Sequence, residues 1–576
     1  MGGTARTTDE DGYGDKGTGG RGADVPGAIR LSGPRGRWVV LTAVLGSGMA
    51  MLDSTVVNVA LPHIGDDLHA DLAVLQWTVN AYMLTLAGLI LLGGALGDRY
   101  GRRRVFVVGV VWFAVASLLC GLAPNAGVLI VARALQGVGG ALLTPGSLAV
   151  LQSVFHPDDR ARAVGAWSGL GGVAAAVGPF VGGWLVDGPG WRWVFFLNVP
   201  LAAVCVPVAL RHVPETRERR ATAHGRFDVP GAVLGALALG AVTYALIAAP
   251  GRGAAPQVVV PAVAGVVLAV VFVRVERRRA DPMLPLEIFS SRQFTAVNAV
   301  TVCVYAAFGG FFFLAVLQLQ VVAGYSALAA GTALLPTTLL MLLLSARSGE
   351  LGRRIGPRVP LTVGPLLCAG GMLLMTRVGQ GASYPADVLP ALLVLGAGMV
   401  TLVAPLTSTV LASVDVDRAG LASGINNAAA RAAGLVAVAA LPLLAGMGPD
   451  AYRSADEFGA TFRRAMPLCA GVLVVGAVIA WLGVRTGELR GTAGNGEEPG
   501  ESAASEEGGR PSGEVGGRAA GEERGRTGER SAGGEGAGKA PEGGGARTCR
   551  PECGYHCAVA APPLEPGEPG KGPRGG

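Results

Sequence analysis

Three charged residues stand well inside long apolar segments of the chain. Asp53 lies in the segment 38–61, Arg133 in 126–150 and Arg431 in 421–446. A charge at this depth in a bilayer is costly and marks a functional position unless shown otherwise. A carboxylate can take up and release a proton, and a nearby guanidinium favours its ionised form. Asp53 and Arg133 are therefore candidates for a proton-binding site.

The positions of Asp53 and Arg133 in their segments predict that the two side chains can meet. Each lies about seven or eight residues from the same end of the membrane, roughly 12 Å at the rise of a helix. Pairing would offset part of the cost of burying both charges. We expect Asp53 to couple transport to protons. For Arg133 the choice between a coupling and a structural role stays open, because a fixed ion pair could also simply lock two helices together.

Arg431 has a simpler interpretation. We place it one to two turns from the cytoplasmic end of its segment, so its long side chain can reach the membrane surface by snorkelling.

Several amide side chains could line a substrate cavity. They could equally anchor the chain at the membrane interface, because some lie near the ends of their segments. The candidates for substrate contacts are Asn58, Gln76, Asn80, Gln136 and Gln318.

These residues require long membrane-spanning helices to position them. Only 15% of the 576 residues are charged, 51% are hydrophobic, and the mean hydropathy is +0.47. Apolar segments long enough to cross a bilayer, which takes about 20 residues, recur between residues 38 and 485. The fourteen predicted spans are 38–61, 75–97, 104–123, 126–150, 161–186, 192–211, 228–249, 257–274, 293–320, 329–347, 359–377, 386–412, 421–446 and 464–485. The sequence thus predicts an all-α membrane protein.

The arginines predict the orientation of these spans. The loops on one side carry 21 arginines and those on the other side carry six. By the positive-inside rule the arginine-rich side is cytoplasmic, so both termini are cytoplasmic. The net charge of +6 is spread over these loops, which argues against nucleic-acid binding.

Two tails flank the spans, at residues 1–36 and 487–576. Both are rich in glycine and polar residues, and we predict them to be disordered. The second tail contains a cluster whose spacing matches no zinc pattern, so we expect no metal there. Its members are Cys549, Cys553, His556 and Cys557.

Five sequence motifs, in this order along the chain, resemble those of one transporter family. They are LDSTVVNVALP (52–62), GALGDRYGRRR (94–104), RALQGVGGA (133–141), GPFVGG (178–183) and WRWVFFLNVP (191–200). Each motif alone is weak, but together they resemble the 14-span drug:proton antiporters of the major facilitator superfamily. The resemblance covers residues 38–486.

The resemblance implies a major facilitator fold of two six-helix halves that rock around a central site, plus two extra central helices. The corresponding domains are an N-terminal half at 37–212, a linker with the extra helices at 213–292, and a C-terminal half at 293–486. It also implies two motif sites. The cytoplasmic gate motif comprises Gly97, Asp98, Arg99, Gly101 and Arg102, and the antiporter motif comprises Gly178, Pro179, Gly182 and Gly183. A short basic loop and plain close packing are the simpler interpretations of these two motifs.

By the same resemblance we expect a proton-coupled exporter of drugs or antibiotics in the inner membrane of a bacterial cell. It would act as a monomer, with the proton gradient in place of a cofactor. Asp53 is the one clear acidic residue within the spans, which favours neutral, weakly charged or amphipathic cargo over strongly cationic cargo. A transporter of a polar metabolite and a non-transporting membrane sensor or scaffold are the alternatives. We find no enzyme motif.

Overall fold

The structure is a computed structural model that describes residues 29–216, 228–279, 282–415, 418–448 and 451–485. All of these residues belong to one compact unit. The described chain is helical apart from one isolated bridge, and fourteen of its helical segments are long and apolar enough to cross a membrane. The predicted number of spans is therefore confirmed.

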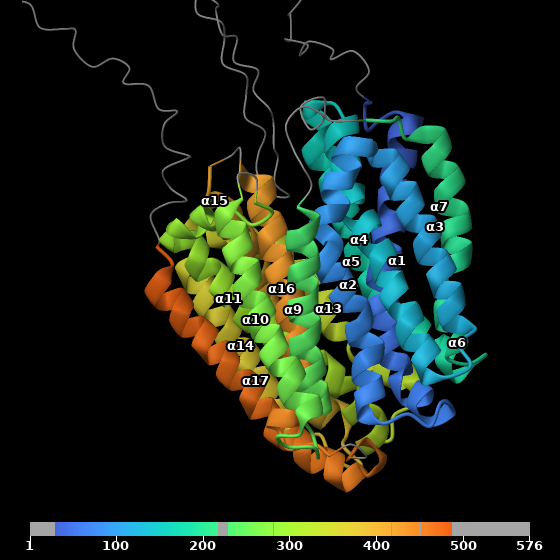
Figure 1. The fold of residues 1–576 in the computed structure, drawn as a ribbon, viewed down its shortest axis with the longest axis vertical. Helices are drawn as coiled ribbons and strands as arrows, with labels where there is room; N and C mark the ends of the chain where they lie inside the picture. The colour runs from blue at the N-terminus through green and yellow to red at the C-terminus, as the bar shows by residue number, and fades with distance from the viewer. Residues whose placement is uncertain (1–28, 217–227, 280–281, 416–417, 449–450, 486–576) are drawn as a thin grey trace, which may run out of the picture. The chain divides into compact units, whose positions relative to one another are not determined.

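The first half contains six spans, the last of which is broken at Leu197 (Figure 1). Asp71 and Asn125 cap two of these helices, because each side chain accepts a hydrogen bond from the backbone amide three residues later, Val74 and Val128 respectively. The helices are α1 (Pro34–Asp67), α2 (Leu72–Tyr100), α3 (Arg102–Gly121), α4 (Ala126–Val154), α5 (Pro157–Asp187), α6 (Arg192–Phe196) and α7 (Asn198–His212).

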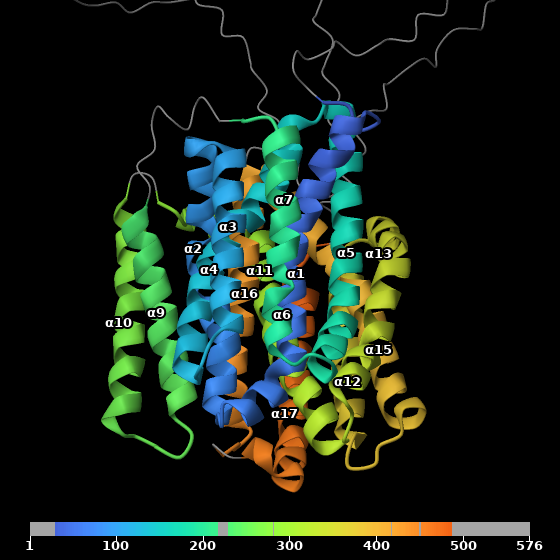
Figure 2. The ribbon, with the colours of Figure 1, turned by 90° about the vertical axis from the view of Figure 1, so that its right-hand side faces the viewer.

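The two extra helices, α9 (Val229–Ala248) and α10 (Pro256–Arg278), are central in the sequence but not in the bundle. Figure 2 shows them side by side at one edge of the molecule. Gly88 of α2 lies against Ala236 of α9, and α9 contributes nearly all the contacts between this pair and the other helices. Most side chains of α10 stay exposed, as expected for a helix that faces lipid.

The second half contains the remaining six spans, one of which is broken at Leu334, just before Pro336. A proline near the start of a helix is tolerated because its missing N–H would be unpaired there. The α-helices are α11 (Arg292–Leu317), α12 (Ala327–Ala333), α13 (Leu335–Ile355), α14 (Arg358–Leu374), α15 (Leu389–Ala412), α16 (Ala419–Leu444) and α17 (Ala455–Gly483). The short turns are η1 (Leu286–Ser290), η2 (Gln318–Val322), η3 (Met375–Arg377), η4 (Tyr384–Val388) and η6 (Ala451–Arg453).

We call the side on which α1 begins the arginine-rich face and the side on which α1 ends the opposite face. The two halves touch at several points near the opposite face. The Asp187 carboxylate accepts hydrogen bonds from the amides of Ala327 (3.1 Å) and Leu328 (2.9 Å), at the start of α12. The Tyr452 hydroxyl donates to the Ala70 carbonyl across the same boundary. These contacts hold the halves together at this face.

Part of the predicted N-terminal tail is ordered, contrary to expectation. Ile29 exchanges backbone hydrogen bonds with Val154 and His156, and the Leu31 amide donates to the Asp159 carboxylate at 3.0 Å. This short segment pairs with the chain between α4 and α5, a contact that leaves no periodic pattern in the sequence. Residues 1–28 and 487–576, with the Cys549 cluster, lie outside the described residues.

Candidate functional site

Asp53 of α1 and Arg133 of α4 form a buried ion pair. The Arg133 Nη1 and Asp53 Oδ2 atoms are 2.5 Å apart, and each residue is 1% exposed. The prediction that the two side chains meet at one depth is therefore confirmed. Neither charge faces lipid or solvent, so each depends on the other and on nearby dipoles for its stability.

Amide side chains complete the surroundings of the Asp53 carboxylate. Its Oδ1 accepts hydrogen bonds from Gln136 Nε2 (2.7 Å) and Asn198 Nδ2 (3.2 Å). Arg133 in turn donates from Nη1 to Gln136 Oε1 (2.7 Å) and from Nε to the Thr78 carbonyl (3.0 Å). Gln136, predicted as a substrate contact, is thus part of the ion-pair network.

Ser117 of α3 supports both amides. Its hydroxyl accepts from Gln136 (3.3 Å) and Asn198 (3.0 Å) and donates to the Phe195 carbonyl (2.8 Å). Six helices therefore contribute to the network around this carboxylate, namely α1, α2, α3, α4, α6 and α7, and α4 and α7 supply its direct donors. Sequence reasoning missed Ser117 and gave Asn198 no role, although Asn198 lies within the last of the five motifs and is the one amide in it.

An aromatic side chain covers the guanidinium. The Tyr82 ring centre lies 4.4 Å from Arg133 Cζ, a cation–π distance, and Phe113 packs edge-on against Tyr82. Protonation of Asp53 would cancel its attraction for Arg133, so uptake of a proton should loosen the pair and the helices that carry it. The geometry is suited to coupling protonation to helix movement.

The other predicted amides divide into two groups. Gln76 donates to the Val438 carbonyl (2.7 Å) and Gln318 donates to the Val378 carbonyl (2.7 Å), so both tie helices together. Asn80 is fully buried, and its side-chain nitrogen and oxygen have no partner among the described residues. Asn58 likewise has a buried, unpartnered Oδ1. Unpartnered buried polar atoms are uncommon and need an explanation.

Arg431 lies deeper than we predicted. It is twelve residues into α16 by its number, or roughly 18 Å from the start of the helix, and its Nε is buried with no partner in the described chain. The predicted depth of one to two turns is therefore wrong, because Arg431 already lies ten residues, or nearly three turns, from the predicted start of its segment at residue 421. Snorkelling stays a prediction, since the side chain is only partly buried.

The gate motif makes its described contacts within the first half and with the start of the linker, where the Thr216 carbonyl accepts a hydrogen bond from the Arg102 amide at 3.0 Å. Asp98 pairs with Arg102 at 2.8 Å, and Arg99 lies over the Tyr100 ring. Gly101 ends α2 with φ of +111°, a conformation that favours glycine, while Gly97 accepts the Gly101 amide through its carbonyl. The latch function of this motif remains a prediction.

The antiporter motif is a packing junction. Gly178 lies against Thr55 and Gly182 against Val56, so this face of α5 approaches α1 closely. Gly183 faces the backbone of Leu328, and Gly331 faces Pro179, which places α5 against α12 of the second half. Small residues permit such close approach.

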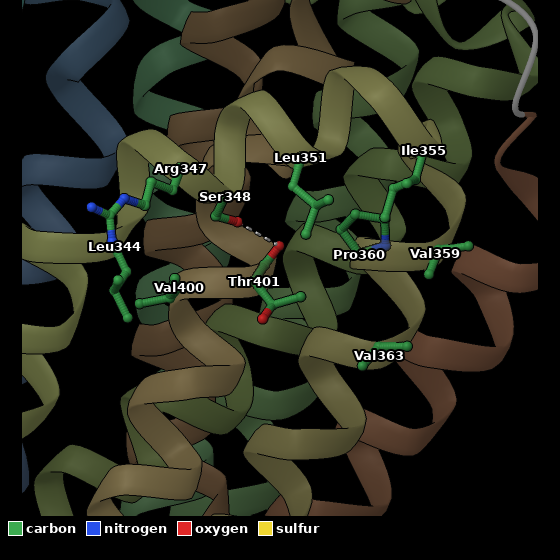
Figure 3. Close-up of a pocket in the computed structure, with 10 residues that line it drawn as sticks. All are labelled: Leu344, Arg347, Ser348, Leu351, Ile355, Val359, Pro360, Val363, Val400 and Thr401. Atoms are coloured by element: carbon green, nitrogen blue, oxygen red, sulfur yellow. Dashed lines mark hydrogen bonds between the residues drawn. The ribbon is translucent and has the colours of Figure 1, made fainter.

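A separate groove of about 350 Å³ lies between α13, α14 and α15, away from the ion pair. Figure 3 shows Arg347 and Leu344 at one end and Ile355 and Val359 at the other. Its lining is mostly apolar and includes none of the predicted site residues. The described residues also contain no cluster of His, Cys, Asp or Glu that could hold a metal ion.

Known proteins resemble this chain in both sequence and fold. The chain is 36% identical to the puromycin resistance protein pur8 of Streptomyces alboniger over 78% of its own length and 91% of that protein. It is 37% identical to the tetracenomycin C resistance and export protein of Streptomyces glaucescens, over 72% and 77%. It is 36% identical to the multidrug resistance protein Stp of Mycobacterium tuberculosis, over 67% and 71%.

Among solved structures, a bacterial homologue of the human lysosomal transporter Spinster, inward-facing and unoccupied, matches with a TM-score of 0.57. It covers 81% of this chain and 100% of its own, at 16% identity. A POT family transporter in complex with 5-aminolevulinic acid matches with a TM-score of 0.59, over 80% and 98%, at 13% identity. These likenesses concern the fold. The sequence model of the Major Facilitator Superfamily matches residues 43–438, and with the relatives above it shows that the chain belongs to this superfamily.

Proposed function

We propose that this protein exports small lipophilic compounds, such as drugs or antibiotics, in exchange for protons. It would do so in the membrane of a bacterial cell, with both termini in the cytoplasm. The names of its relatives support the cargo class, since they denote resistance to puromycin, resistance to and export of tetracenomycin C, and multidrug resistance.

The buried Asp53 carboxylate is the observation that carries proton coupling. It is 1% exposed, yet it has a cationic partner and two amide donors from other helices. In one conformation Arg133 stabilises the ionised carboxylate. In another, Arg133 would withdraw and the carboxyl would hold a proton. Alternation between these two conformations would exchange a proton for a cargo molecule in each transport cycle.

The contacts between the halves support alternating access as the transport cycle. Asp187 and Gly183 of α5 meet the start of α12, and Gln320 Nε2 donates to the Val59 carbonyl at 2.9 Å. In the proposed orientation all of these lie on the outer side. Opening to the outside would break them as the halves rock.

The test uses full-length protein reconstituted in proteoliposomes with puromycin as cargo. An imposed proton gradient should drive transport by the wild type and not by Asp53→Asn, which keeps the shape of the side chain but cannot ionise. Asp158→Asn is the matched control, because Asp158 is an exposed carboxylate paired with Arg30 at the surface. Full gradient-driven transport by Asp53→Asn would refute the coupling role.

A further inference from the structure

The seam between α2 and α16 joins the two halves, and two contacts fix its register. Gln76 of α2 bonds to the Val438 carbonyl, and Leu91 of α2 lies against Gly424 of α16. The two helices run antiparallel. The number of an α2 residue and the number of the α16 residue at the same level therefore always add up to about the same total. This register places Arg431 level with residues 83–84 of α2, midway along the seam.

Arg431 also lies on the face of α16 that meets α2. It is seven residues from Gly424 and seven from Val438, and seven residues make two turns of a helix. Asn80 lies four residues after Gln76, one turn further along the same face of α2. The register therefore brings Asn80 and Arg431 within about one turn of each other.

Both side chains have unused hydrogen-bonding capacity. Arg431 Nε and both polar atoms of the Asn80 amide are buried without a partner among the described residues. Within the described chain Arg431 takes part in no ion pair, whereas Arg133 is neutralised by Asp53. The Arg431 side chain as a whole is partly buried, and a guanidinium in such a position without a counter-ion is costly, which favours a negatively charged partner.

Aromatic residues surround this level of the seam. By the register above, Tyr82 of α2 is one to two residues from the level of Arg431, and the Tyr305 carbonyl of α11 would lie 3.6 Å from a Cβ at Gly434, less than one turn after Arg431. Tyr82 is the same residue whose ring covers Arg133, so Arg431 stands close to the proposed proton site. Counting Asp53, Arg133 and Arg431 together, the region carries one net positive charge when Asp53 is ionised.

We propose that Arg431 and Asn80 form a recognition site for an anionic oxygen, such as a carboxylate or ionised phenol, on an aromatic cargo molecule. Arg431 supplies the charge, Asn80 supplies a second donor, and Tyr82 and Tyr305 flank the aromatic part. The inference rests on the proposed export function and narrows its cargo class. It also departs from the expectation of mainly neutral cargo, because that expectation considered buried acids alone and gave no weight to the partly buried Arg431.

Binding of two nearly isosteric probes tests the site. Tritiated 1-naphthoate carries the anionic oxygen and 1-naphthamide lacks the charge, and scintillation proximity on purified full-length protein measures both. The wild type should bind the naphthoate about tenfold to a hundredfold more tightly, the range expected for a hydrogen bond to a charged group. Equal binding of the two probes by the wild type, or binding of neither, would overturn the proposal.

Variants assign the preference to Arg431. Arg431→Gln should bring the ratio of the two affinities close to one while leaving naphthamide binding within about twofold of wild type. Arg431→Lys should keep part of the preference. Arg347→Gln, which removes an exposed arginine of α13, should keep all of it. If Arg431→Gln fails to fold, the Arg431→Lys variant and the affinity ratio of the wild type still test the site. An unchanged preference for naphthoate in the Gln variant, which lacks the Arg431 charge, would refute the assignment.

This outcome can be told apart from a failure of the proposed function. A wild type that exports puromycin against its gradient but shows no preference for naphthoate refutes only the recognition site. A wild type that prefers naphthoate but shows no gradient-driven transport of either compound refutes the export function instead.

Discussion

At the scale of single residues, Asp53 is held in a way that stability alone does not explain. A buried ion pair contributes little net stability, because desolvation of both charges offsets their attraction. Asp53 nevertheless has Arg133, Gln136 and Asn198 as donors, drawn from two further helices. Such an arrangement makes the charge state of one carboxyl sensitive to the positions of α4 and α7.

Gln136→Leu should impair transport more than Asn198→Leu. Gln136 bonds to both members of the ion pair at 2.7 Å, whereas Asn198 bonds to Asp53 alone at 3.2 Å. We expect Gln136→Leu to lower gradient-driven puromycin transport about tenfold, equivalent to about 1.4 kcal/mol. Thr78→Val is the control, because Arg133 uses the Thr78 carbonyl and not its hydroxyl. Equal rates for Gln136→Leu and wild type would contradict this prediction.

The sequence predicts the ion pair but not the groups around it. Asp53 and Arg133 stand out because each is a charge inside an apolar segment, and depth along a helix is readable from residue number. Ser117 and Tyr82 are ordinary residues for such helices. Their contacts depend on how α2, α3 and α4 rotate and pack, which no local pattern encodes.

At the scale of helices, the junction of α5 with α12 is the most constrained contact between the halves. A side chain at Gly183 would meet the Leu328 backbone and the Ala327 carbonyl oxygen. Gly183→Leu should therefore keep the halves apart at the opposite face and strongly reduce transport, measured in proteoliposomes.

Gly169→Leu is the matched control for this junction, since it lies on the same helix with nothing within 4 Å of an added Cβ. It should transport at close to the wild-type rate. If both variants transport equally, the α5–α12 contact does not need to form during the cycle.

Gly101 is the second constrained element, at the turn from α2 to α3. Its φ of +111° is one that residues with a side chain rarely adopt. Gly101→Ala should cost about 1–3 kcal/mol and lower the melting temperature. Gly94→Ala should not lower it, because Gly94 lies within α2 and an added Cβ would be 3.7 Å from the Pro145 Cβ, an ordinary contact distance. Thermal unfolding followed by tryptophan fluorescence compares them, and equal losses would refute the conformational argument.

Element boundaries show where sequence reasoning reached its limit. Fourteen spans were predictable because about twenty apolar residues suffice to cross a bilayer. The breaks at Leu197 and Leu334 were not, because the apolar character continues across both. The depth of Arg431 was misjudged for a different reason: counted from the predicted start at residue 421, it already lies roughly 15 Å along the segment, more than the one to two turns that we assigned.

At the scale of the whole molecule, the extra pair α9 and α10 occupies an edge beside α2 and α16 (Figure 2). Its place in the sequence, between the halves, does not specify this location. The connections to the pair could have led to either side of the bundle. Contacts such as Gly88 with Ala236, Leu84 with Gly240 and the ring of Trp77 with that of Tyr244 select this side.

Removal of residues 491–576 should leave transport intact. All fourteen spans and the ion-pair site lie between residues 34 and 483. The truncated and full-length proteins should move puromycin at rates within about twofold in the same proteoliposomes. If the truncated protein is present in the same amount as the full-length protein but does not transport, the C-terminal segment takes part in transport or assembly.

The orientation of the whole molecule is predicted by its arginines and can be measured directly. Gly253 lies in the exposed turn between α9 and α10, on the opposite face from the arginine-rich loops. An epitope inserted there should bind antibody on intact spheroplasts, because the positive-inside rule places this face outside. An epitope at the C-terminus should bind only after permeabilisation. The reverse pattern of antibody binding would mean that the arginine-rich face lies outside the cell. The α5–α12 contacts would then close the cytoplasmic side.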